Sequence, residues 1–148
     1  MAFTILIISS VLILILIILF LNYYNPEYKT VKVKVGNYTV VADLADSIPK
    51  KIKGLMGRKN LDENEGMLFT FGENDKPSIW MMNMSIPIDI IWIDSEGKVT
   101  HIVKDAQPCV INCTTYSPGK ESKYVLEVSS NFTERHNIKI GTKVEIPV

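Results

Sequence analysis

The sequence predicts a mainly β fold, a closed barrel-like sheet or a sandwich of short strands with one short helix, preceded by a single transmembrane helix. Two patterns support this expectation. Short apolar or alternating segments recur after residue 30, separated by turn residues, as in sandwiches and barrels. The first 26 residues contain no charged side chain. We therefore expect an anchor over residues 1–24, a linker over 25–30 and a soluble β-rich domain over 31–148.

The N-terminal segment has the composition of a membrane-spanning helix. Residues 2–21 are apolar except for one threonine and two serines. Twenty helical residues rise about 30 Å, the thickness of the hydrocarbon core of a bilayer. The run is long and no basic residue precedes it, which favours an uncleaved anchor over a signal peptide. We expect residues 2–21 to hold the protein in the cell membrane.

The strands are predicted from alternation or from short runs of β-branched and aromatic residues. They cover residues 31–35, 38–42, 67–71, 79–84, 88–93, 98–103, 123–128 and 143–146. Gly36-Asn37 between the first two strands is a hairpin turn, and Asp94-Ser95-Glu96-Gly97 marks the clearest hairpin in the sequence.

One short helix and one further helical turn are expected between the strands. Ser47 can cap a short helix on which Ile48, Ile52 and Leu55 share one face. Asn131 with Glu134 can cap a further helical turn before the last strand.

The side of the membrane that the domain faces is indicated by opposing signals. Three lysines follow the anchor: Lys29, Lys32 and Lys34. They would place the domain in the cytoplasm by the positive-inside rule, although they also fit the solvent face of the first strand. Four Asn-x-Ser/Thr sequons favour the opposite side: Asn37, Asn83, Asn112 and Asn131. With the cysteine pair described next, these sequons lead us to expect the outer face.

Cys109 and Cys113 are the only cysteines in the chain. Such an isolated close pair indicates a disulfide in an oxidising compartment. Free thiols, a redox pair or half of a metal site are the alternatives. A zinc site would need two more ligands, and neither His101 nor His136 has ligand spacing. We expect a disulfide.

A series of short sequence motifs resembles those of a known family. In order these are Gly54-Leu55-Met56-Gly57-Arg58, Gly66-Met67-Leu68-Phe69, Trp80-Met81-Met82-Asn83, Ile86 to Asp94, Pro108-Cys109, Tyr116 and Tyr124-Val125-Leu126-Glu127. The set is similar to the family called domain of unknown function 192, over roughly Val33 to Val148. The resemblance implies a compact mainly β domain, usually behind a signal peptide or anchor, with no established activity. Met82 and Met84 stand where that pattern would have a lysine and a threonine.

Composition and motifs exclude several classes of function. Sixteen basic and sixteen acidic residues cancel, and no basic stripe accompanies exposed aromatic residues, so nucleic acid is not an expected partner. No nucleophile elbow or phosphate-binding loop occurs. We expect a non-enzymatic binding module without a cofactor, whose partner is a small ligand, a glycan or an envelope protein. The resemblance makes six residues plausible ligand contacts: Arg58, Trp80, Asn83, Asp89, Tyr116 and Glu127.

Asp89 stands in an otherwise apolar strand, where burying an unpaired carboxylate costs several kcal/mol. We expect an ion pair, with Arg58 as the natural bidentate partner and Lys123 or Tyr116 as others. A ligand-binding carboxylate is the alternative. Glu127 lies in a similar strand, so an alternative function is a hydrolase that uses Asp89 and Glu127 as an acid/base pair.

A third hypothesis about function concerns Trp80, Met82 and Met84, which share one face if their segment is a strand. Thioethers select Cu(I), and an indole face can stack on a cation, so these residues could form a copper-handling site. Packing in the core is the simpler reading, since Met fills irregular gaps.

Overall fold

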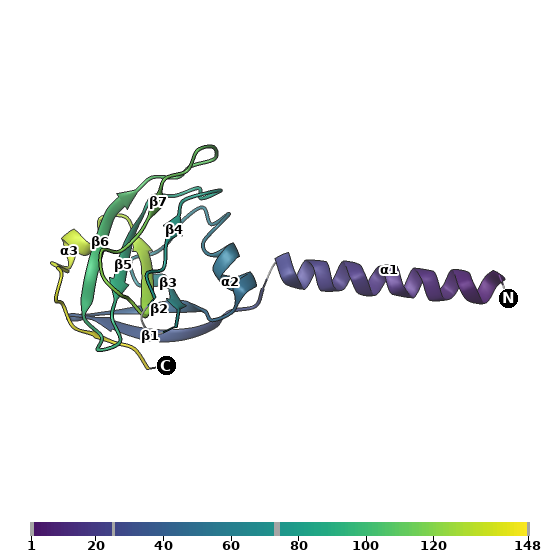
Figure 1. Ribbon diagram of the computed structural model, residues 1–148, viewed down its shortest axis with the longest axis horizontal. Coiled ribbons are helices and arrows are strands. Elements are labelled where there is room, and N and C mark those ends of the chain that lie inside the picture. The colour runs from purple at the N-terminus through teal and green to yellow at the C-terminus, as the bar shows by residue number, and fades with distance from the viewer. Residues whose placement is uncertain (1, 25, 73–74, 148) are drawn as a thin grey trace.

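The computed structural model describes residues 2–24, 26–72 and 75–147, and within the N-terminal helix it describes the side chains of residues 7–21. A seven-stranded sheet in the order β6-β5-β8-β3-β2-β1-β9 curls into a half-barrel (Figure 1). Its strands are β1 (Lys29–Val35), β2 (Tyr38–Ala45), β3 (Glu65–Thr70), β5 (Ile88–Ile93), β6 (Val99–Ala106), β8 (Tyr124–Ser129) and β9 (Val144–Glu145). A second, two-stranded sheet pairs β4 (Ile79–Trp80) with β7 (Thr115–Tyr116). The mainly β prediction is therefore confirmed.

All but one of the pairings in the large sheet are antiparallel. The exception is β2 with β3, which run parallel because the chain crosses between them through the short helix α2 (Ile48–Lys53). Both predicted hairpins form. Strand β1 joins β2 around Gly36. Strand β5 joins β6 through a turn in which the Asp94 Oδ1 accepts hydrogen bonds from the backbone N–H groups of Glu96 and Lys98. The crossover places α2 beside the sheet, a position that matters for the site.

The two edges of the half-barrel are joined at one end by the C-terminal segment. Strand β9 pairs with β1, and Val144 donates a backbone hydrogen bond to Gly97 at 2.7 Å. A Cβ atom on Gly97 would lie 2.4 Å from the Val144 carbonyl oxygen, and its φ is +77°, so the turn before β6 requires glycine. Gly66 of β3 likewise approaches β8, where a Cβ would lie 2.6 Å from the Glu127 carbonyl oxygen.

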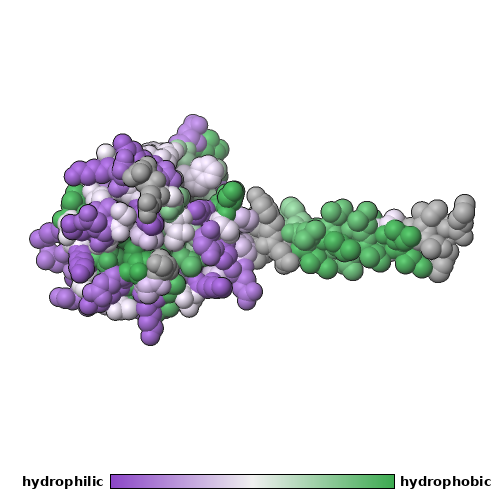
Figure 2. Space-filling view, turned by 60° about the horizontal axis from the view of Figure 1, so that its bottom comes forward, coloured by the Kyte–Doolittle hydropathy of each residue, from purple (hydrophilic) through white to green (hydrophobic). Residues whose placement is uncertain are grey.

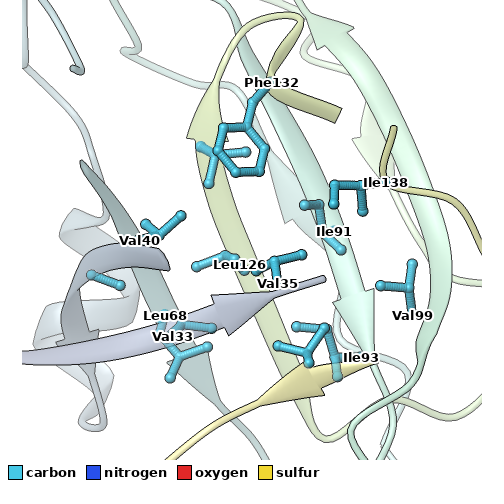
Figure 3. Packing of buried hydrophobic residues seen from close by; sticks show 13 residues of the cluster. Val33, Val35, Val40, Leu68, Ile91, Ile93, Val99, Leu126, Phe132 and Ile138 are labelled. Atoms are coloured by element: carbon cyan, nitrogen blue, oxygen red, sulfur yellow. The ribbon is translucent and has the colours of Figure 1, made fainter. Parts of the chain in front are cut away.

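The sheet buries a hydrophobic cluster on each face. Side chains from β1, β9 and β6 meet those of the central strands in one cluster, so this cluster fills the concave face (Figure 3). Phe132 of helix α3 (Phe132–Arg135) covers one end of it. The opposite, convex face packs against α2 and β4, with Trp92 fully buried and its Nε1 donating to the Pro77 carbonyl at 2.8 Å. Every residue of β5 is buried because both faces are covered, which explains its continuous apolar run.

The structure does not support the expected transmembrane helix. Helix α1 (Ala2–Tyr24) projects away from the strands, and its described surface is apolar (Figures 1 and 2). Among the described residues, no helix is long and apolar enough to cross a membrane. The fold class is therefore a mainly β half-barrel in which α2 and α3 are short helices, and the described residues give no support to the anchoring role expected of residues 2–21.

One predicted strand is much shorter than expected. Of residues 79–84, only Ile79 and Trp80 pair as a strand, since the chain turns at Asn83, whose φ is +57°. The partner strand β7 lies between residues 104 and 122, where no strand was predicted. This small sheet lies over the convex face and positions the candidate site.

Candidate functional site

A pocket of about 380 Å³ opens between α2, the segment that follows β4, and the convex face of the sheet. We call it the α2–β4 pocket. Its walls are mainly apolar: Ile48, Ile52, Leu55, Met56, Phe69, Phe71, Ile79, Trp80, Met82 and Met84. Its polar side chains are few: Lys51, Lys53, Ser78, Thr115 and Glu127. A concave apolar wall with a small number of polar groups is the usual form of a small-molecule site.

Helix α2 forms one side of the pocket. Pro49 fits its first turn, and Gly54, with a φ of +48°, ends it. Ile48 and Ile52 are 72% and 47% exposed at the mouth, whereas Leu55 beyond the helix is buried. The predicted apolar face of this helix therefore does not pack into the core over its whole length, and part of it remains open beside the pocket.

The segment from Ile79 to Met84 forms the opposite side. Trp80, Met82 and Met84 all line the pocket, and Met81 points the other way into the core with 1% exposure. Trp80 is 45% exposed, so its ring is accessible at the mouth. The predicted common face of Trp80, Met82 and Met84 thus holds, although most of this segment is not a regular strand.

Glu127 is the acidic group of the pocket wall. It lies on β8 opposite Ile90 of β5 and Met67 of β3, and it is only 4% exposed. Among the residues that the structure describes, none hydrogen bonds to its carboxyl group, and burial raises its pKa to about 8. Near neutral pH the carboxyl is therefore mostly protonated, and it presents an O–H donor and a carbonyl acceptor to the pocket.

Asp89 lies on the concave side, away from the pocket. Its position is opposite Val128, whereas Glu127 is opposite Ile90, and successive side chains of a strand point to opposite faces. The two carboxyl groups are therefore separated by the sheet. The acid/base pair required by the hydrolase reading is absent in the described structure.

The hydrogen bonds of Asp89 also correct the predicted ion pair with Arg58. Its Oδ1 accepts from the backbone N–H groups of Asp105 at 2.9 Å and Asn131 at 3.1 Å. Its Oδ2 accepts from the Thr133 N–H at 2.9 Å and the Thr133 hydroxyl at 2.5 Å. Four donors satisfy the carboxylate without a cation, and they fix the start of α3 against β5.

Arg58 instead pairs with Asp43 of β2, close to Tyr28. Burial is the main reason that the pKa of Tyr28 is raised to about 12, and the Arg58 charge opposes this shift. Asn83 donates its backbone N–H to the Cys109 carbonyl, and Tyr116 pairs with Ile79 in the small sheet. Of the six predicted contact residues, only Trp80 and Glu127 line the pocket.

The residues that sequence reasoning missed come from α2 and β3. Ile48 and Ile52 were expected only to share one face of a helix, and Phe69 and Phe71 only to belong to a short strand. One signal was available: the family motif at residues 54–58, which follows the helix, contains Met56, and Met56 also lines the pocket. Their convergence depends on the parallel crossover from β2 to β3, which local patterns do not report.

Cys109 and Cys113 form the expected disulfide, with their Cα atoms 5.5 Å apart. No group of three or more His, Cys, Asp or Glu residues in the described part of the chain could hold a metal ion. The soft atoms that line the pocket are the thioethers of Met56, Met82 and Met84.

Comparison with known proteins identifies the half-barrel as a recurring fold. A protein of Sinorhizobium meliloti 1021, described with a suggested role as a transcription regulator, superimposes with a TM-score of 0.75 and 26% identity, covering 82% of this chain and 97% of that one. A protein of unknown function from Novosphingobium aromaticivorans superimposes with a TM-score of 0.74 and 29% identity, covering 84% and 96% of the two chains.

A curated relative also carries no established activity. It is a UPF0127 protein of Thermococcus kodakarensis, 34% identical over 86 residues, or 57% of this chain. The match spans half the length of that relative. The model of the DUF192 family, described as an uncharacterised ACR, matches residues 31–146, which include every strand except the first two residues of β1. The chain therefore belongs to the DUF192 family of uncharacterised proteins.

Proposed function

We propose that this protein binds a small ligand in the α2–β4 pocket and does not itself catalyse a reaction. The observation that carries the proposal is the Glu127 carboxyl group, buried in an apolar wall without a hydrogen-bond partner among the described residues. No fully buried side-chain oxygen or nitrogen of the described residues lacks a hydrogen-bond partner, so the Glu127 oxygen atoms are reached from the pocket. A ligand with a donor group could bind them there.

The chemistry of the wall defines the ligand class. The apolar side chains accept a hydrocarbon or aromatic body, and Trp80 offers a flat face at the mouth. Glu127 accepts a hydrogen bond from an amine, amide or hydroxyl group, most strongly when the carboxyl is ionised and the donor is an ammonium ion. We therefore expect a small apolar molecule with one donor group, and we favour an amine. A glycan or an envelope protein would match the narrow apolar pocket less well.

The test uses hexylamine, with hexanol of the same length as the neutral comparison, and follows Trp80 fluorescence and calorimetric heat. Binding an ammonium ion requires Glu127 to lose its proton, which is retained up to a pKa of about 8. Hexylamine affinity should therefore rise by about tenfold per pH unit between pH 6 and 8 and then level off, whereas hexanol affinity should stay nearly constant.

Two variants separate the pocket from general charge effects. Glu127→Gln should abolish the pH dependence of hexylamine binding, and Glu96→Gln, which removes an exposed acid outside the pocket, should leave it unchanged. Equal hexylamine affinity in the wild type and the Glu127→Gln variant at every pH would refute the proposal. So would the absence of any binding up to millimolar concentrations.

A second candidate function is Cu(I) binding, favoured by one observation. Three thioethers, from Met56, Met82 and Met84, line the same pocket as the Trp80 ring. Cu(I) titration against a chromogenic chelator tests it. Met82→Leu should weaken binding at least tenfold, and Met81→Leu, which changes the neighbouring buried side chain, should not. Binding weaker than micromolar would exclude this function.

We also propose that the domain works in an oxidising compartment outside the cytoplasm. The Cys109–Cys113 disulfide supports this, since such bonds rarely persist among cytosolic reductants. Intact cells would be treated with a membrane-impermeant thiol reagent, before and after an impermeant reductant. Labelling only after reduction is the expected result. Labelling only in broken cells without a reductant would place the domain in the cytoplasm.

A further inference from the structure

The disulfide loop is directly connected to one wall of the α2–β4 pocket. Just before the loop, Cys109 accepts a hydrogen bond from the Asn83 N–H at 2.9 Å and donates its own N–H to the Met81 carbonyl at 3.1 Å. These two bonds enclose Met82, whose side chain lines the pocket. The position of Met82 therefore depends on where Cys109 is held.

The chain on the other side of the loop contacts the same wall. Thr115 pairs with Trp80 and Tyr116 pairs with Ile79, in the opposite strand direction from the contact between Cys109 and Met82. The chain must reverse between residues 109 and 115 to make both contacts. The Cys109–Cys113 bond closes that bend, with the two Cα atoms 5.5 Å apart.

Little else holds the bend. Val110 and Ile111 between the cysteines are 73% and 79% exposed, so they bury almost no apolar surface. Asn112 has a φ of +55°, a conformation that non-glycine residues adopt infrequently. A short exposed loop with few buried contacts is the part of a fold that opens first when a constraint is removed.

We infer that the oxidation state of the Cys109–Cys113 disulfide controls the α2–β4 pocket, an inference that rests on the binding function proposed above. The oxidised bond holds Trp80 and Met82 in place as the pocket wall. Reduction releases the bend, and the wall becomes mobile while the two clusters of the half-barrel remain packed. The pocket then binds its ligand less tightly.

The reaction is a thiol–disulfide exchange with a dithiol reductant. A thiolate of the dithiol attacks one sulfur of the Cys109–Cys113 bond, which breaks and leaves the other cysteine as a thiolate that takes up a proton. The second thiolate of the dithiol then attacks the mixed disulfide. Two electrons pass to the protein, which ends with two thiols, and the dithiol ends as a disulfide.

The experiment compares the oxidised protein with the protein reduced by dithiothreitol, at pH 8 where hexylamine binding is strongest. The dissociation constant for hexylamine should rise by about tenfold on reduction. The double variant Cys109→Ala/Cys113→Ala should bind as weakly as the reduced protein, and dithiothreitol should not change it further. Equal affinity in all of these states would overturn the inference.

A second readout does not depend on any ligand. Acrylamide quenching of Trp80 should increase on reduction, whereas the fully buried Trp92, observed alone in a Trp80→Phe variant, should stay protected. Unchanged Trp80 quenching would refute a mobile wall, and loss of Trp92 protection would mean that the whole domain unfolds. If the oxidised protein fails to bind hexylamine, the proposed function fails, and the quenching experiment alone decides whether the disulfide controls the wall.

Discussion

Asp89 and Glu127 are both buried carboxylic acids on neighbouring central strands, yet their surroundings are opposite. Asp89 faces the concave side and accepts four hydrogen bonds from residues 105, 131 and 133. Glu127 faces the convex side and lines a pocket without a partner among the described residues. Burial alone therefore does not identify the role of an acid. The supply of donors separates a group that stabilises the fold from a group left available to a ligand.

The largest effect is expected from removing the charge of Glu127. The unfolded chain ionises this group near pH 4.5, whereas the folded protein retains the proton up to about pH 8. The free energy of unfolding of the wild type therefore falls as the pH rises through this interval and levels off above it. The glutamine side chain of the Glu127→Gln variant does not titrate. At pH 8 the free energy of unfolding of this variant should therefore be about 4 kcal/mol higher than that of the wild type.

Urea denaturation of the two proteins at pH 4.5 and pH 8 measures this difference. At the lower pH the folded wild type holds the proton and the unfolded chain is half protonated, so ionisation should separate the two stabilities by only about 0.4 kcal/mol. A gain of the same size at both pH values would show that packing rather than ionisation causes it.

The corresponding change at Asp89 should act in the opposite direction. Asp89→Asn places an amide N–H₂ among donor groups and removes the negative charge that all four of them contact. We expect a loss of about 3 kcal/mol in the free energy of unfolding. Chemical denaturation at pH 7 measures it. A variant as stable as the wild type would show that the four hydrogen bonds contribute little.

The smallest effect is expected from one member of the Asp89 set. Thr133→Val removes the hydroxyl that donates to Oδ2 and keeps the backbone N–H, so we expect a loss of about 1 kcal/mol. Thr133→Ser retains the hydroxyl and serves as the control in the same denaturation assay. A serine variant less stable than the valine variant would indicate that the methyl group matters more than the hydrogen bond.

The sequence predicts those parts of the fold that depend on neighbouring residues. The bounds of β5 match the prediction, because six residues buried on both faces form an uninterrupted apolar run. The hairpin after it is also correct, since the Asp94 side chain accepts from backbone N–H groups within the turn and Gly97 adopts its positive φ. The strand expected over 79–84 is too long because its partner there is an irregular loop.

The candidate site is less predictable for a physical reason. Three of the four donors to Asp89 are backbone N–H groups, which every residue except proline possesses, so no side-chain pattern points to them. Arg58 was a reasonable partner for Asp89 by charge, but the folded chain places Arg58 in an ion pair with Asp43 instead. Alternation along β8 predicts that Glu127 and Val125 lie on the same face of the sheet. It does not predict the pocket beside Glu127, which forms because α2 packs next to that face.

The first strand of the half-barrel bears on how the protein avoids aggregation. Strand β9 covers its outer edge only at Lys34 and Val35, so in the described pairings the edge from residue 29 to 33 has no neighbour. An open strand edge is a template for pairing with another molecule. The exposed lysines along it, at positions 29 and 32, would bring like charges together if two such edges met. We therefore expect these two lysines to disfavour pairing of this edge with a neighbouring copy.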